Sequence, residues 1–216
     1  MPFRRSTRLG LWAGVLVPVI YFGVQLWRAP AVPGYSFRRD AASDLGAAGV
    51  PGAVWFNVAA VASGIAAVLA AVAWWDAPRA WGVGRLGRGF VCGALTSIGA
   101  ASIAAGWFPL PDDRHGGGPV GIGLFALPIL LVFAIARRSA PGWVRVYVVA
   151  NAALFVVAAL MFSGATWLDP TVDEGVMQRV LACSVFVPIG VLSAAALAAG
   201  RRRDGRRRPG RQVTAT

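Results

Sequence analysis

The residues best suited to chemistry lie in stretch 107–118, between two long apolar runs. It contains Asp112, Asp113 and His115, the only histidine of the chain. A carboxylate beside an imidazole can form a general acid–base pair or bind a metal ion. With one histidine, the other ligands would be carboxylates, which suit a hard cation better than zinc. We favour a simpler interpretation, in which the stretch is a polar turn between two helices. Its acidic residues would then stabilise the N-terminus of the helix that follows. We therefore expect no metal and no cofactor.

Two further polar stretches, 34–46 and 169–179, carry additional candidates. Asp44 is a catalytic candidate with Asp112, Asp113 and His115, or else a helix cap or a partner of Arg179. Gln178 and Arg179 are ligand-binding candidates; the guanidinium could clamp a carboxylate or phosphate, or reach the lipid headgroups. Asn57 is a third ligand-binding candidate, but for Asn57 and Asn151 we favour hydrogen bonds between helices.

The elements that must position these residues are membrane helices. The chain has 216 residues, of which 57% are hydrophobic and only 14% charged, well below the charged fraction of soluble domains. Runs long enough to cross a bilayer as helices occur at Leu9–Trp27, Ala53–Trp75, Gly89–Phe108, Pro119–Ala136, Val144–Ala165 and Val176–Ala199. We predict an all-α polytopic membrane protein, a bundle of six transmembrane helices over 1–200, with a disordered basic tail over 201–216.

The distribution of charge predicts the orientation. Most of the 21 basic residues, all arginine, fall at the termini and in alternate connections, whereas most acids fall in the other connections. The positive-inside rule then places both termini in the cytoplasm and the protein in the plasma membrane. The arginine-rich tail could bind nucleic acid, but a basic run directly after a helix favours anionic lipid. We therefore expect no nucleic-acid partner.

Small residues in the second and third predicted helices indicate close helix packing. They predict that these helices form the tight centre of the bundle, and similar faces could bind another membrane protein or a second copy of this chain. Arg88 and Cys92 recur as Arg179 and Cys183 at equivalent places in the third and sixth helices. This recurrence is weak support for an inverted repeat of the kind found in transporters.

Three short motifs at helix ends carry a resemblance to a known family. They are Ser43-Asp44-Leu45-Gly46, then Phe108-Pro109 with Asp112 and His115, then Gly175 with Gln178-Arg179. In this order they resemble the bacterial six-helix membrane family called domain of unknown function 998, which is distantly similar to the eukaryotic Frag1/DRAM/Sfk1 group. The resemblance implies a six-helix membrane fold and no particular reaction.

Three classes of function remain open. We favour a non-enzymatic membrane protein, either a binding or transport protein with an outward-facing polar site or an accessory subunit. The lack of charged residues at mid-membrane depth argues against the transport hypothesis. The alternative is a membrane-embedded hydrolase or transferase that acts on a lipid headgroup through Asp44, Asp113 and His115.

Overall fold

The computed structural model describes residues 3–136, 138–169 and 171–206, with side chains as far as Arg201. Within these residues there is no strand, so the predicted all-α class is confirmed. The long helices are α1 (Arg5–Arg28), α2 (Ala53–Trp74), α3 (Arg85–Trp107), α4 (Gly123–Ile135), α5 (Gly142–Phe162) and α6 (Glu174–Arg206). Short 3₁₀ segments are η1 (Ala29–Ala31), η2 (Ala42–Gly46), η3 (Ala77–Trp81) and η4 (His115–Ile122). Six segments are long and apolar enough to span a membrane, as predicted.

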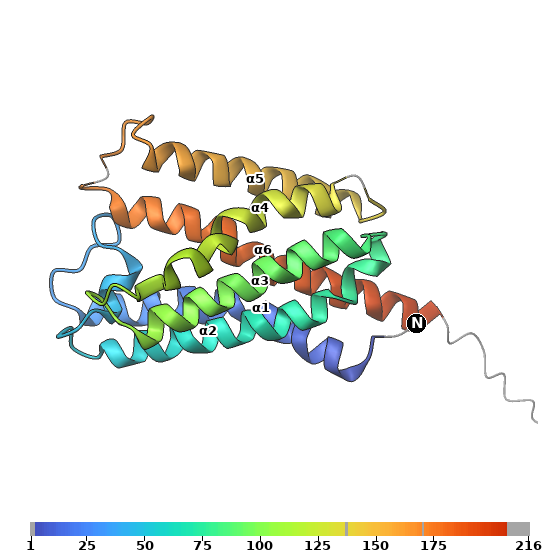
Figure 1. Ribbon diagram of the computed structural model, residues 1–216, viewed down its shortest axis with the longest axis horizontal. Helices are drawn as coiled ribbons and strands as arrows, with labels where there is room; N and C mark the ends of the chain where they lie inside the picture. The colour runs from blue at the N-terminus through green and yellow to red at the C-terminus, as the bar shows by residue number, and fades with distance from the viewer. Residues whose placement is uncertain (1–2, 137, 170, 207–216) are drawn as a thin grey trace, which may run out of the picture.

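The helices run side by side in an elongated bundle (Figure 1). The connections 29–52, 108–122 and 163–173 gather at one end, here called the loop end, whereas α1 begins and α6 ends at the other. The three polar stretches therefore share one rim of the bundle. Helix α6 continues to Arg206, past the predicted end at Ala199, and the rest of the predicted tail, 207–216, lies outside the described residues.

Glycine allows α2 and α3 to approach closely. A Cβ atom added to Gly99 would lie 2.6 Å from the carbonyl oxygen of Gly64, and one added to Gly64 would lie 2.5 Å from that of Gly99. At Gly106 an added Cβ would lie 2.4 Å from the carbonyl oxygen of Asn57. Only glycine fits at such contacts, so the prediction that small residues hold these two helices together is confirmed.

The predicted helix Pro119–Ala136 falls in a segment, His115–Ile135, that is long and apolar enough to span a membrane, but it is α-helical only from Gly123, and residues 119–122 belong to the 3₁₀ segment η4. Gly116, Gly117 and Gly118 have positive φ angles of 75°, 71° and 51°, which interrupt η4, and α4 begins only at Gly123. Glycine adopts such angles without steric cost, whereas other residues rarely do. Thirteen residues of α-helix span about 20 Å, less than the apolar core of a bilayer. Segment η4 therefore has to complete the crossing.

The late start of α4 places it level with the middle of α3. The N–H of Gly123 donates to Oγ of Ser97, 2.8 Å away, and Ser97 lies halfway along α3. The loop end between α3 and α6 is consequently occupied by the irregular segment η4 rather than by a full helix.

Helices α5 and α6 are joined by a side-chain hydrogen bond. Nδ2 of Asn151 donates to the carbonyl of Ser184 at 2.8 Å. This contact between α5 and α6 confirms the hydrogen bond predicted for Asn151.

Candidate ligand-binding site

Arg179, one turn into α6, holds the first loop against the start of that helix. Its Nη1 atom donates to the carbonyls of Phe37, Asp40 and Gly175, at 2.9, 3.0 and 2.8 Å. Its Nη2 atom bonds to the hydroxyl of Tyr35, and the guanidinium lies 4.7 Å from the centre of the Phe37 ring. These donors are thus engaged by two loop carbonyls, by the Gly175 carbonyl of α6 and by a tyrosine hydroxyl, and the clamp on a carboxylate or phosphate stays a prediction.

Asp44 and Gln178 fix the segment η2. The carboxylate of Asp44 accepts a hydrogen bond from the N–H of Ala41 at 2.8 Å, and Oε1 of Gln178 accepts one from the N–H of Ala42 at 2.6 Å. Burial raises the pKa of the Asp44 carboxyl above its ordinary value, while this hydrogen bond opposes the change. The contact agrees with the interpretation of Asp44 as a cap.

Asn57 serves the same segment from α2. Its Nδ2 atom donates to the carbonyl of Gly46, the last residue of η2, at 3.0 Å. A hydrogen bond between two membrane helices, as predicted for Asn57, is therefore not the one that forms. Segment η2 lies over the end of α2, and its Gly46 carbonyl is the acceptor instead.

Asp44 and Asp112 lie close enough to His115 to interact with it electrostatically, but the hydrogen bonds of the second loop go to other partners. Asp112 binds Arg114, with 2.7 Å between Oδ2 and Nη2, and this partner lowers the pKa of the carboxyl to about 2. Asp113 is exposed. Nδ1 of His115 lies 2.9 Å from the carbonyl oxygen of Phe108. Within the described residues, no side-chain hydrogen bond or ion pair joins His115 to Asp44, Asp112 or Asp113. The contacts are those of a polar turn.

The third loop is attached to the first by an ion pair. Asp173 is only 4% exposed and its carboxylate accepts a hydrogen bond from Nε of Arg38. This hydrogen bond is the main reason that the pKa of Asp173 lies below its ordinary value. The N–H of Gly175 and that of Val176 donate to the carbonyls of Arg39 and Arg38, at 3.2 and 3.1 Å. The N–H of Ala48 in the first loop donates to the carbonyl of Leu110 in the second at 2.8 Å, so all three loops form one connected layer.

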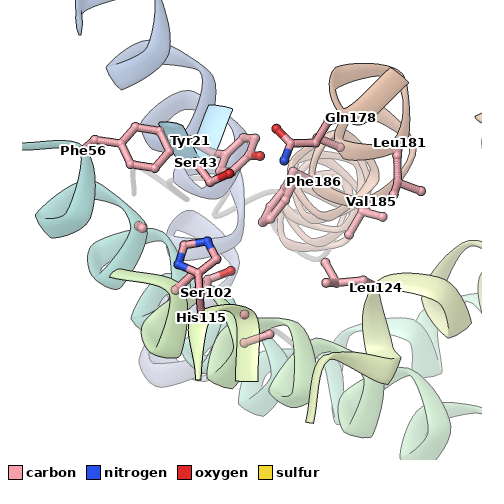
Figure 2. Close-up of a pocket in the computed structure, with 15 residues that line it drawn as sticks. Tyr21, Ser43, Phe56, Ser102, His115, Leu124, Gln178, Leu181, Val185 and Phe186 are labelled. Atoms are coloured by element: carbon pink, nitrogen blue, oxygen red, sulfur yellow. The ribbon is translucent and has the colours of Figure 1, made fainter. Parts of the chain in front are cut away.

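A cavity of about 280 Å³ lies beneath this layer (Figure 2). Its wall is mainly apolar, with Phe56 from α2, Leu124 from α4, and Leu181, Val185 and Phe186 from α6. Five polar residues other than Arg, Lys, Asp and Glu also line it, namely Tyr21, Ser43, Ser102, His115 and Gln178. These polar residues come from α1, η2, α3, η4 and α6, so the cavity exists only because five separate elements meet there.

Several polar groups in the cavity have capacity left for a ligand. Among the described residues, the hydroxyls of Tyr21, Ser43 and Ser102 have no hydrogen-bond partner in the protein. Gln178 uses Oε1 for Ala42, which leaves its NH₂ group as a donor. If Nδ1 of neutral His115 donates to the Phe108 carbonyl, Nε2 is an acceptor. The wall therefore offers both donors and acceptors but no side-chain charge.

Two of the predicted site residues, His115 and Gln178, line the cavity. Asp44, Asp112, Asp113, Asn57 and Arg179 do not. No group of three or more His, Cys, Asp or Glu residues that could hold a metal occurs in the part of the chain that the structure describes. Sequence reasoning missed Tyr21 and Ser102, which are isolated polar residues inside apolar helices. Ser43 belongs to one of the family motifs, but no role was predicted for it.

The six apolar helices and the cavity beneath the loops define a polytopic membrane protein with a chamber at one end of its bundle. The family model described as a protein of unknown function, DUF998, matches residues 15–196, and the chain belongs to this family. No curated protein and no solved structure matches the chain. The distant similarity to the Frag1/DRAM/Sfk1 group stays a prediction.

Proposed function

We propose that the protein is a non-enzymatic membrane protein that binds a single-chain, uncharged amphiphile in the cavity beneath its loops. The observation that carries this proposal is the composition of the wall, in which five neutral hydrogen-bonding residues face a mainly apolar chamber. Ligand sites of membrane and soluble proteins share this character, an apolar surface with a few convergent polar groups.

The volume limits the size of the ligand. An apolar cavity of about 150 Å³ holds one benzene molecule, so about 280 Å³ has room for on the order of ten non-hydrogen atoms. One acyl or prenyl segment of that length fits, whereas the two chains of a phospholipid do not. A longer single chain would have to extend out of the cavity into the bilayer.

The order of residues along α6 gives the ligand a direction. Gln178 lies at the loop end, and Leu181, Ala182 and Val185 follow within two turns. Seven residues of helix correspond to about 10 Å of depth. A ligand would therefore place its polar group near Gln178, Ser43 and His115 and its chain toward the middle of the membrane.

The absence of a charged side chain from the cavity wall favours an uncharged polar group on the ligand. An ionised ligand would lose its hydration without gaining an ion pair. A hydroxyl suits the wall, since it can donate to His115 and accept from the NH₂ group of Gln178.

The distribution of arginine supports the proposed setting. The bundle end that carries the chain termini is rich in arginine, so the loops and the cavity would face the outside of the plasma membrane with both termini in the cytoplasm. The basic tail would contact anionic lipid there, and the exposed helix faces could bind another membrane protein or a second copy.

The alternative function is a hydrolase or transferase that acts on a lipid headgroup. Its support is His115, which lies in the cavity wall; Asp44 and Asp113, the other two proposed catalytic residues, lie outside it. Incubation of the full chain with phospholipid vesicles would distinguish the two. We expect no release of headgroups, and release that depends on His115 would favour the enzyme.

Saturable binding of tritiated 1-decanol to the full chain in nanodiscs, corrected for empty nanodiscs, tests the proposal. We expect Ala182→Phe to abolish the saturable component, because Ala182 is buried in the cavity wall. Ala153→Phe is the matched control, since Ala153 is exposed on α5, and Ala105→Leu is a milder second variant. The proposal fails if decanol binding to the parent does not saturate, or if both cavity variants bind like the control.

A further inference from the structure

A second site lies at the opposite end of the bundle, in a groove between the start of α3 and the end of α4. The groove has a volume of about 410 Å³ and includes two arginines, Arg85 and Arg138. We infer that this groove binds one anionic phospholipid, with the phosphate between the two guanidinium groups. The site is separate from the cavity and does not depend on the function proposed for it.

The two arginines have their donors available. Both are exposed, and within the described residues neither guanidinium makes a hydrogen bond or an ion pair. The neighbouring Arg88 differs, because it is 6% exposed and its Nη1 donates to the carbonyl of Trp75 at 2.7 Å. Arg88 closes the turn between α2 and α3, which leaves Arg85 and Arg138 as the free cations of the groove.

In the part of the chain that the structure describes, no acidic side chain lines the groove. Asp76, the acid nearest in sequence to the start of α3, is bound to Arg79 with 3.1 Å between Oδ1 and Nη2. The first turn of α3 also contains no acidic residue, and its N-cap is Gly84, which supplies no side-chain hydrogen bond. The unpaired N–H groups of that turn add to the positive potential of the two arginines. The groove is therefore complementary to a phosphate.

The rest of the groove suits an acyl chain. Leu130 lies in its wall, and the exposed side chains Leu86, Phe90 and Phe133 are 79%, 61% and 76% accessible. Leu86 lies beside Arg85, whereas Phe90 on α3 and Leu130 on α4 lie further from these helix ends, so the apolar wall continues from the arginines toward the middle of the bundle. Basic pockets between helix ends that continue into an apolar surface have the form expected for an anionic lipid. The combination of charge and apolar wall selects a lipid rather than free phosphate.

Native mass spectrometry of the full chain, titrated with phosphatidylglycerol or with phosphatidylcholine of the same acyl chains, tests this site. Each basic residue near the surface contributes roughly fivefold to the binding of anionic lipid. We expect the double variant Arg85→Gln/Arg138→Gln to bind phosphatidylglycerol about thirtyfold more weakly, with phosphatidylcholine binding unchanged. The double variant Arg85→Lys/Arg138→Lys should retain most of the affinity, because it keeps both charges.

The matched control is Arg5→Gln/Arg145→Gln, which removes two exposed arginines from the same end of the bundle but outside this groove. It should lose much less affinity than the groove variant, since the basic tail is present in both. Equal losses would show that phosphatidylglycerol responds only to total charge and would overturn the inference. Unchanged binding in the groove variant would also overturn it, as would competition by inorganic phosphate as effective as by lipid.

Discussion

The imidazole of His115 is held by the backbone of Phe108, with 2.9 Å between Nδ1 and the carbonyl oxygen. This contact spans the second loop and turns the ring into the wall of the cavity, as Figure 2 shows. In the neutral ring it leaves Nε2 as an acceptor. The only histidine of the chain is therefore positioned to accept a hydrogen bond from a ligand.

Replacement of His115 by Asn separates the two roles of the ring, the hydrogen bond to the Phe108 carbonyl and the acceptor offered to a ligand. An Asn amide can keep the donor near the position of Nδ1, but it lacks the acceptor at Nε2. We expect His115→Asn to unfold at nearly the parent temperature and to bind 1-decanol about fivefold more weakly, the effect of one neutral hydrogen bond. Decane, which has no hydroxyl, should bind both proteins equally. A fivefold loss for decane as well would contradict a hydrogen bond to the hydroxyl.

Decanoate tests the inferred neutrality of the ligand. Among the described residues no arginine lines the cavity, and neutral His115 carries no charge, so the carboxylate would lose its hydration without an ion pair. We expect decanoate to bind at least tenfold more weakly than 1-decanol at pH 7 in the same nanodisc assay, by order of magnitude. Tighter binding of decanoate would mean that Arg179 or another cation reaches the ligand.

The contact between α2 and α3 predicts opposite effects for two glycines of one helix. At Gly99 an added Cβ would lie 2.6 Å from a backbone oxygen of α2, whereas at Gly93 nothing lies within 4 Å. Gly99→Ala should lower the free energy of unfolding by about 2 kcal/mol, because the helices must separate. Gly93→Ala should leave it unchanged or raise it by about 0.5 kcal/mol through helix propensity. Denaturation in mild detergent measures both, and similar values would refute the close contact.

The layer of loops depends on Arg179. Its removal in Arg179→Ala takes a donor from two carbonyls of the first loop, those of Phe37 and Asp40, and we expect a loss of about 3 kcal/mol of stability. Protease should then cut within 34–46 in the folded protein. Arg39→Ala is the control, because the exposed side chain of Arg39 binds only within the first loop, to Asp40 and to the carbonyl of Gly34, and does not join the loop to α6. Equal resistance of both variants to protease would show that Arg179 does not hold the loop.

Low pH should loosen the same layer through Asp173. Its folded pKa is lowered, chiefly by Arg38, so its stabilising contribution is complete above the unfolded pKa and is lost as the pH falls through the folded value. We expect the melting temperature of the parent to fall below about pH 4. Asp173→Asn should melt lower at pH 7 and show a smaller acid-induced decrease. A parallel pH dependence in both proteins would assign the decrease to other carboxylates.

The length and spacing of the apolar runs predicted the six membrane segments, because only continuous apolar helices cross a bilayer. Small residues predicted the contact of α2 with α3. The 3₁₀ form of residues 119–122 was not predictable from hydropathy, since they continue the same apolar run as α4. Just before them, Gly116, Gly117 and Gly118 adopt positive φ angles, and His115 and Gly116 line the cavity.

The candidate site was predicted only in part. His115 and Gln178 stood out because polar residues are rare here, yet Tyr21 and Ser102 lie in apolar runs and are indistinguishable there from packed residues. Arg179 and Asp44 attracted attention through their charge, which serves the loop backbone instead. Which polar side chain faces a cavity depends on helix rotation and loop docking, and neither can be read from composition.

Photolabelling tests the central claim most directly. A decanol analogue with a diazirine on its alkyl chain is added to the full-length protein in lipid nanodiscs and activated by light. Peptide mapping then identifies the labelled residues. Binding in the cavity predicts labels on Leu124, Leu181 or Val185, with competition by 1-decanol and loss of these labels in Ala182→Phe but not in Ala153→Phe. Labels restricted to the exposed face of α5, or labels in the cavity wall that persist in Ala182→Phe, would contradict it.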